Sequence, residues 1–125
     1  MAPTRREFGD LGERLAVQHL LANGYRIRER NFRVREGEID IIAERDGLLA
    51  FIEVRCRRGE AMGTAVESLS PAKQRRLVTL ADAYDQAREK LPEQRRIDVI
   101  AVDFAPGGRL LSLQHIKGAI EANCD

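Results

Sequence analysis

The sequence of 125 residues contains no tryptophan, only two cysteines and no long apolar run. Its longest uninterrupted apolar stretch, residues 48–52, is far shorter than the ~20 residues that a membrane-spanning helix needs. Cys56 and Cys124 lie too far apart to suggest a disulfide framework or a paired metal-ligand motif. The first residues carry charges that no apolar stretch follows, unlike a secretory signal. We therefore expect a cytoplasmic protein with free thiols and no membrane partner.

An excess of one charge sign is also missing. The 21 Lys and Arg residues against 20 Asp and Glu residues give a net charge of +1. With 43% apolar residues, this balance argues against a disordered acidic or basic tail. Because domains average roughly 100–200 residues, we expect a single domain over residues 1–125.

The basic residues are mostly arginine, eighteen against three lysines. The planar guanidinium suits phosphate binding, although the codon usage of a GC-rich genome would produce the same excess. Basic residues gather in segments 26–35, 55–58 and 73–76, whereas acidic residues gather in 82–93. A nearly neutral protein can therefore still present a positive face to a polyanion.

Hydrophobic periodicity predicts an α/β fold in the order α-β-β-β-α-β-β, with a mixed sheet flanked by helices. Turn signals are expected at Glu36-Gly37 and Asp46-Gly47, and Ser70-Pro71 is typical of a helix start. The strand–helix–strand unit 48–104 predicts a right-handed crossover between parallel strands. The expected elements are helices near 7–23 and 70–91, strands near 25–35, 38–44, 48–55, 97–104 and 110–116, a loop over 56–69, and a short helical tail.

Folding the hairpin about Asp46-Gly47 places Asp40 opposite Glu53 and Glu38 opposite Arg55. Directly opposed residues have their Cβ atoms about 4.5–5.5 Å apart. Two carboxylates at that distance repel by about 3 kcal/mol at an effective dielectric constant near 20. A divalent cation, Mg²⁺ or Mn²⁺, would compensate this repulsion. A slipped register, or carboxylates turned into solvent, would relieve the repulsion without a metal ion.

The sequence of the acidic hairpin resembles a known motif. Residues 37–42 (Gly-Glu-Ile-Asp-Ile-Ile) and 51–58 (Phe-Ile-Glu-Val-Arg-Cys-Arg-Arg) look like the split acidic motif of PD-(D/E)XK nucleases. More narrowly, the sequence resembles the YraN-like family of small bacterial proteins, relatives of Holliday junction resolvases. The likeness extends through Gly12-Glu13, Lys73-Gln74 and Ile97-Asp98-Val99, and so covers most of the chain.

The resemblance implies a restriction-endonuclease-like core with a metal ion held by the hairpin acids. Arg55 stands where the superfamily has a catalytic lysine, and arginine stays protonated and cannot act as a base. It could still neutralise charge on a phosphate, or form a salt bridge with Glu38, a candidate supporting residue. The implied catalytic residues are Asp40, Glu53 and Arg55, and the implied metal ligands are Asp40, Glu53, the carbonyl of Val54 and Glu13.

The implied function is a metal-dependent nucleic-acid phosphodiesterase, with DNA, including branched DNA, as the expected partner. Two other readings stay open: a nucleic-acid-binding protein with little or no turnover, and a protein-interaction module that recruits a partner at an exposed strand edge. Since branched-DNA resolvases act as dimers, analogy suggests a homodimer. The residues expected to contact nucleic acid are Arg33, Arg35, Arg57, Arg58, Lys73, Gln74, Arg75 and Arg76.

Five other residues are weaker candidates. Asp98 lies in a buried strand, where it either pairs with an arginine or supports the site. Tyr84 is expected in the core, and Cys56 is expected to be structural. His19 is expected to pack or to face solvent, and His115 has no assigned catalytic role.

Overall fold

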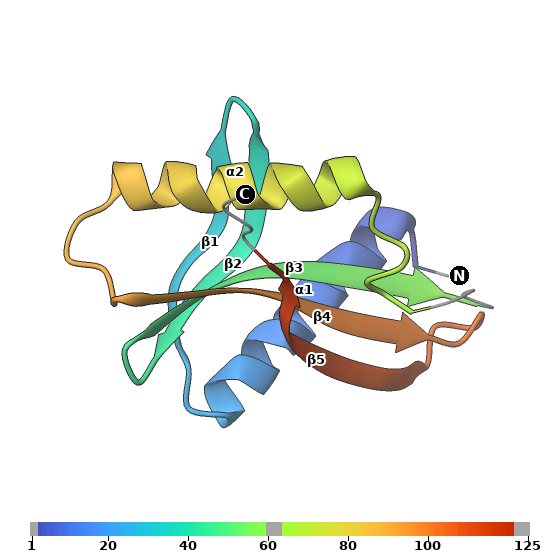
Figure 1. Ribbon diagram of the computed structural model, residues 1–125. Coiled ribbons are helices and arrows are strands. Elements are labelled where there is room, and N and C mark those ends of the chain that lie inside the picture. Colours follow the sequence, from blue (N-terminus) through green and yellow to red (C-terminus); the bar gives the residue numbers. More distant parts are fainter. Residues whose placement is uncertain (1–2, 60–63, 122–125) are drawn as a thin grey trace.

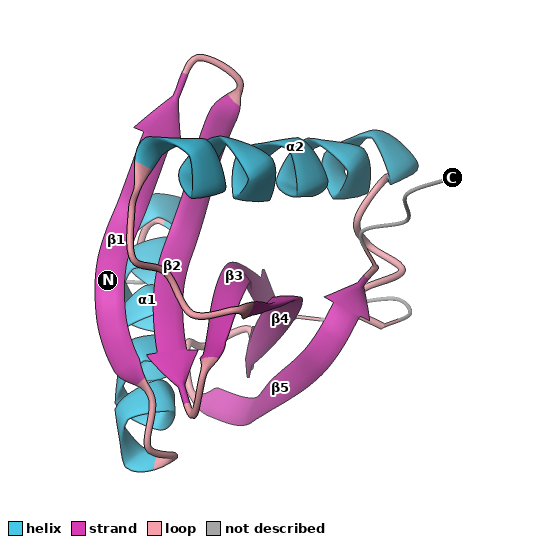
Figure 2. Cartoon of the chain, turned by 60° about the vertical axis from the view of Figure 1, so that its left-hand side comes forward, coloured by secondary structure: helices cyan, strands magenta, loops and turns pink. Residues whose placement is uncertain are grey.

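The computed structural model describes residues 3–59 and 64–121, and its five-stranded sheet lies between two helices (Figures 1 and 2). Strands follow the chain order across the sheet, and only β3 and β4 pair in parallel. This arrangement confirms the predicted α/β class and element order. The elements are α1 (Arg5–Ala22), β1 (Arg26–Val34), β2 (Gly37–Arg45), β3 (Leu48–Arg58), α2 (Pro71–Ala87), β4 (Gln94–Phe104) and β5 (Leu110–Ile120). No helix in the described part of the chain is long and apolar enough to cross a membrane.

Helix α1 begins earlier than its apolar spacing predicts because Thr4 caps it. The Thr4 side chain accepts from the N–H of Glu7, whose carboxylate accepts from the N–H of Thr4, which satisfies two free donors at once. The helix ends as predicted before Gly24, whose φ of +84° favours glycine. Gly12, near its middle, lets the helix approach β3 closely, since a Cβ there would collide with the Cys56 sulfur.

We expect the substitution Gly12→Ala to lower the free energy of unfolding by about 2 kcal/mol, because the added methyl group overpacks the contact with Cys56. When Cys56 is also replaced by alanine, the loss of unfolding free energy caused by Gly12→Ala should be smaller. Urea unfolding of the wild type, the two single variants and the double variant measures this coupling. Gly9→Ala is the matched control on the same helix, since a Cβ there meets nothing within 4 Å. Additive effects of the Gly12 and Cys56 substitutions would contradict this packing.

The two hairpins differ in how well the sequence located their turns. Asp46 and Gly47 have φ of +48° and +80°, as a two-residue hairpin turn requires, and Arg45 pairs with Leu48 as predicted. The first turn lies one residue earlier than expected. Val34 pairs with Gly37, so residues 35–36 form the turn and Gly37 opens β2.

Several element ends also differ from the prediction. Strand β3 continues to Arg58 because its parallel ladder with β4 extends to Phe104, so residues 56–58 are strand rather than loop. Helix α2 ends at Ala87, which leaves Leu91 outside it. Strand β5 runs on to Ile120 in place of the predicted start of a helical tail. The rest of that tail lies outside the described residues.

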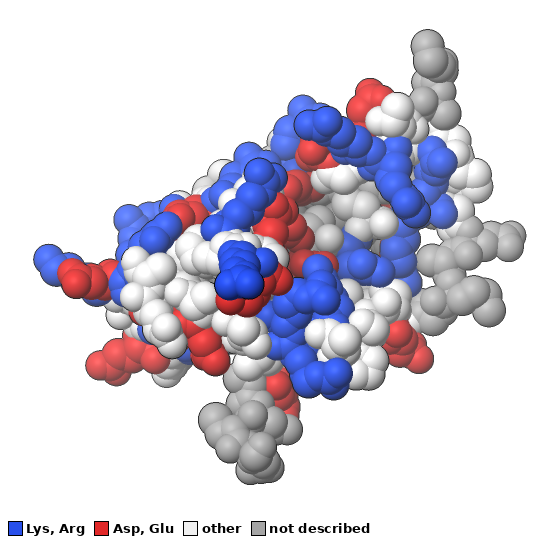
Figure 3. Space-filling model, turned by 90° about the horizontal axis from the view of Figure 1, so that it is seen from above, with Lys and Arg blue, Asp and Glu red and all other residues white. Residues whose placement is uncertain are grey.

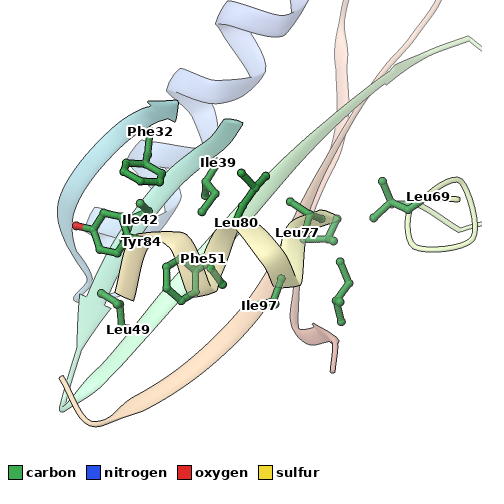
Figure 4. Packing of buried hydrophobic residues seen from close by; sticks show 14 of the residues in the cluster. Phe32, Ile39, Ile42, Leu49, Phe51, Leu69, Leu77, Leu80, Tyr84 and Ile97 are labelled. Atoms are coloured by element: carbon green, nitrogen blue, oxygen red, sulfur yellow. The ribbon is translucent and has the colours of Figure 1, made fainter. Parts of the chain in front are cut away.

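Each face of the sheet has its own apolar core. Under α2, Tyr84 lies at the centre, as predicted, with its ring edge-on to Phe32 and Phe51 (Figure 4). Under α1, Leu20 packs on alternate residues of β2 and β3, including Ile41 and Ile52. The alternation along β3 places residues 49 and 51 under α2 and residues 50, 52 and 54 under α1.

Candidate functional site

The acidic pair lies where the β2–β3 ladder stops. The ladder extends to Ile41 and Ile52, and Asp40 and Glu53 are the next residue on each strand. The Val54 N–H donates to Asp40 Oδ2 at 2.8 Å, and the Glu53 carboxyl group is near enough for its charge to act on Asp40. The Glu53 side chain is only 7% exposed. The hairpin register therefore brings the two predicted carboxyl groups together.

The two acids of this pair repel, and Asp40 itself has no cation within ion-pair distance among the described residues. Burial raises the pKa of Asp40, and the charge of Glu53 raises it further, to about 8, although the Val54 N–H acts in the opposite direction. The more distant Glu13 adds to the repulsion. Near neutral pH the pair thus holds either a proton or a cation. Its donors are hard carboxylate oxygens, the ligands that Mg²⁺ and Mn²⁺ prefer.

One cation of the chain does reach the pair. Lys73 Nζ lies 3.6 Å from Glu53 Oε2. Ser70 sets this position, because its hydroxyl accepts from the Lys73 N–H and caps α2. The sequence predicted Lys73 as a nucleic-acid contact, and its proximity to Glu53 was missed. The contact appears only in the structure, because Lys73 and Glu53 belong to different elements, α2 and β3.

Glu13 lines the same hollow as Asp40, and its carboxylate is bound by residues of β1. Its Oε1 accepts from Arg30 and from the Asn31 side chain, each at 3.1 Å. Among the residues that the structure describes, no three His, Cys, Asp or Glu side chains are arranged to hold a metal ion. Of the predicted ligands, Asp40 and Glu53 therefore lie beside each other, and Glu13 is bound to partners on β1.

Arg55 and Glu38 do not form the predicted rung. Glu38 forms an ion pair with Arg33 across the β1–β2 hairpin. Arg55 Nη2 instead donates to Ser68 Oγ at 3.1 Å, and its buried Nε has no hydrogen-bond partner among the described residues. The predicted Glu38–Arg55 salt bridge is wrong because the β2–β3 ladder ends before it reaches these residues.

A hollow of about 620 Å³ opens beside Asp40 on the α1 side. Sequence reasoning missed that Arg5 and Arg6 of α1 line it. The spacing of Arg6 with Asp10 and Glu13, four and seven residues apart, could have placed Arg6 on the same helix face. The lining residues are Arg5, Arg6, Phe8, Gly9, Asp10, Glu13, Asn31, Arg33, Glu38, Asp40, Val54, Cys56, Arg57, Arg58 and Phe104.

The predicted nucleic-acid contacts fall into three groups. Arg33, Arg35 and Arg58 are exposed. Arg75 and Arg76 are exposed on α2, and from this side acidic atoms lie centrally with Lys and Arg atoms around them (Figure 3). Arg33 is also paired with Glu38, and the other three have partners within the protein: Lys73 lies against Glu53, Arg57 binds Asp103 through two hydrogen bonds, and Gln74 donates to the Leu69 carbonyl.

Asp98 lies in a buried hydrogen-bond network away from the residues described so far. Its carboxylate is fully buried and binds Arg96, His115 and the Gly118 N–H, so pairing with an arginine is what the structure shows. His19 packs against His115 with 3.3 Å between ring nitrogens.

Comparison with known proteins gives the family. The model of the uncharacterised protein family UPF0102 matches residues 12–102. The chain belongs to this family. A UPF0102 protein of Symbiobacterium thermophilum is 48% identical over 84% of this chain and 89% of its own length. The UPF0102 protein of Roseiflexus castenholzii is 43% identical over 97% and 98%, and that of Myxococcus xanthus is 44% identical over 94% and 92%.

The region matched by the UPF0102 model contains the candidate site. Glu13, Asp40, Glu53 and Lys73 all lie within residues 12–102. The hollow's Arg5 and Arg6 lie outside the matched region, as does β5. The YraN-like resemblance is thus confirmed at the level of the family.

Proposed function

We propose that this UPF0102 protein is a divalent-metal-dependent nucleic-acid phosphodiesterase that acts on DNA. The observation that carries the proposal is the pair of largely buried carboxyl groups, Asp40 and Glu53, on neighbouring strands where the β2–β3 ladder ends. Juxtaposed buried carboxylates cost folding free energy, and such a cost is common where a site binds or catalyses. The likeness of this hairpin to the PD-(D/E)XK motif supports the same reaction class.

The donor set fits Mg²⁺ or Mn²⁺. The carboxylates of Asp40 and Glu53 would hold the ion together with the Val54 carbonyl, and water and phosphate oxygens would supply the other ligands. When bound, the ion would polarise a phosphodiester and lower the pKa of a water molecule. Burial of Glu53 and the Val54 N–H bond to Asp40 keep both carboxyl groups in place before any ion arrives.

The chain's arginines would bind and orient the substrate. Arg33 and Arg58 lie at the hollow beside Asp40, where their guanidinium groups can donate to phosphate oxygens. Arg55, held by Ser68, cannot take a proton and would act only through its positive charge. Such contacts read the backbone rather than the bases, so binding should be largely independent of sequence and should weaken with salt.

We expect linear or branched DNA to be cleaved in the presence of Mg²⁺ or Mn²⁺, and Asp40→Ala and Glu53→Ala each to lower the rate at least about 100-fold. Each substitution removes a ligand of the ion that stabilises the transition state. Gel-based cleavage assays measure this, with Asp82→Ala, an exposed acid of α2, as the control. Undiminished cleavage by both site variants would reject the assignment.

A second function is favoured by the positions of Glu13 and Arg55. Glu13 is bound to Arg30 and Asn31, and Arg55 stands in the lysine position. Both features suit a nucleic-acid-binding protein with little turnover. Gel shifts together with metal calorimetry distinguish the two: DNA binding without metal binding favours this second function.

A further inference from the structure

Lys73 is placed as a counter-ion for the acidic pair. Its ammonium lies 3.6 Å from Glu53 Oε2, and Glu53 is the only carboxylate within ion-pair distance of it among the described residues. The Lys73 side chain is 33% exposed, whereas that of Glu53 is 7% exposed. A flexible cation that is one-third exposed therefore lies against a nearly buried anion.

An ammonium and a divalent cation cannot both occupy this place. Each neutralises Glu53, and at close range the two positive charges repel. We propose that Lys73 is the internal counter-ion of the carboxylate pair, displaced from Glu53 when a divalent cation binds there and thereby released to contact a substrate phosphate. The inference rests on the proposed metal site and adds how that site is regulated.

The fold favours Lys73 over Arg55 for this role. Arg55 lies two residues after Glu53 on β3, but its guanidinium is hydrogen-bonded to Ser68. The Lys73 side chain is a flexible chain of four methylene groups that ends in an ammonium. It extends from the first turn of α2, close in sequence to the exposed Arg75 and Arg76. Once displaced, its ammonium would remain near the first turns of α2, where Arg75 and Arg76 are exposed.

Displacement couples two ligands. If the metal ion frees Lys73 for phosphate, it strengthens the binding of a polyanion, and by linkage the polyanion strengthens the binding of the metal ion by the same factor. Without Lys73 the two binding events become more independent. Lys73 thus adds to the coupling that comes from phosphate oxygens binding the metal ion directly.

The first test is calorimetric titration of the full chain with Mg²⁺ and with Mn²⁺, without nucleic acid. We expect Lys73→Gln to bind each ion about five-fold more tightly than the wild type, since no ammonium competes. Lys73→Arg keeps the charge and should stay near the wild-type affinity. Lys90→Gln, the same change at an exposed lysine, should also leave the affinity unchanged.

The second test measures binding of a DNA duplex by fluorescence anisotropy with and without Ca²⁺, a cation that carboxylate oxygens also bind. We expect Ca²⁺ to strengthen binding to the wild type several-fold, and to do so less in Lys73→Gln than in Lys90→Gln. Equal or weaker Mg²⁺ affinity in Lys73→Gln would overturn the counter-ion role while leaving the metal site standing. A wild type that binds no divalent cation would overturn the metal site and this inference together.

Discussion

Replacing Asp98 with alanine is expected to lower the free energy of unfolding by about 3–5 kcal/mol, because a buried ion pair would lose one partner. The carboxylate is fully buried and accepts from Arg96 at 2.8 and 2.9 Å. His115 lies 2.8 Å from it, and the Gly118 N–H donates at 2.9 Å. Burial alone would raise the pKa of Asp98, yet these hydrogen bonds hold it below its ordinary value. The substitution leaves all three partners without their acceptor.

Urea unfolding at neutral pH measures this loss as a lower midpoint with an unchanged slope. Small domains have total stabilities of about 5–15 kcal/mol, so part of the variant could be unfolded without denaturant. Asp103→Ala is the matched control, because Asp103 also lies on β4 and binds an arginine, Arg57, but its side chain is 22% exposed. We expect the control to lose about 1 kcal/mol or less. Equal losses in the two variants would show that the buried network adds no more stability than the partly exposed Arg57–Asp103 pair.

The sequence predicted the carboxylate pair because hairpin register follows from local chemistry. Asp46 and Gly47 both adopt positive φ, and once the turn is fixed every rung follows by counting. The ladder stops at Ile41 and Ile52, and the next residues, Asp40 and Glu53, still lie side by side, but two residues further along counting no longer holds. The Glu38–Arg55 rung was therefore wrong although the turn that predicted it was right.

The partners of Asp98 could not be predicted in the same way. They come from its own strand and from β5, and the β4–β5 register shifts between Ile97 and Val99. A register shift of this kind has no sequence signature as strong as an Asp-Gly turn. The sequence showed only that a buried carboxylate needs partners, which left its role open.

The partners of long charged side chains could not be predicted either. Glu13 was placed on the correct helix, but Arg30 and Asn31 of β1 took up its carboxylate. Lys73 was placed at the start of α2, but its reach to Glu53 depends on how α2 lies on the sheet. Periodicity gives the face of an element, whereas the partner of a flexible charged side chain depends on packing between elements.

In metal-free buffer, the protein is expected to lose stability as the pH rises from about 4 to about 8, and Asp40 is the cause. Its pKa is raised from 3.8 to about 8 by burial and by Glu53. Across this window the folded state holds a proton that the unfolded chain has already released. Stability therefore falls with rising pH, on the order of 3–5 kcal/mol in total, and this loss is complete above the folded-state pKa.

The substitution Asp40→Asn removes this dependence. The asparagine oxygen can still accept from the Val54 N–H, and its amide can donate to Glu53, so the geometry is kept without the charge. We expect the variant to be more stable than the wild type at pH 8 and close to it at pH 4. Asp46→Asn makes the same chemical change at an exposed turn residue, with an 87% exposed side chain, and should follow the wild-type curve.

Thermal or urea unfolding at several pH values between 4 and 8 measures the difference between the two curves, which cancels the titration of other groups. Adding Mg²⁺ at pH 8 should restore stability to the wild type in proportion to its binding, because the ion replaces the missing proton. It should restore little to Asp40→Asn. Parallel pH curves for the wild type and Asp40→Asn would mean that Asp40 is ionised in the folded protein without cost. The need for a cation at this pair, on which the phosphodiesterase proposal depends, would then disappear.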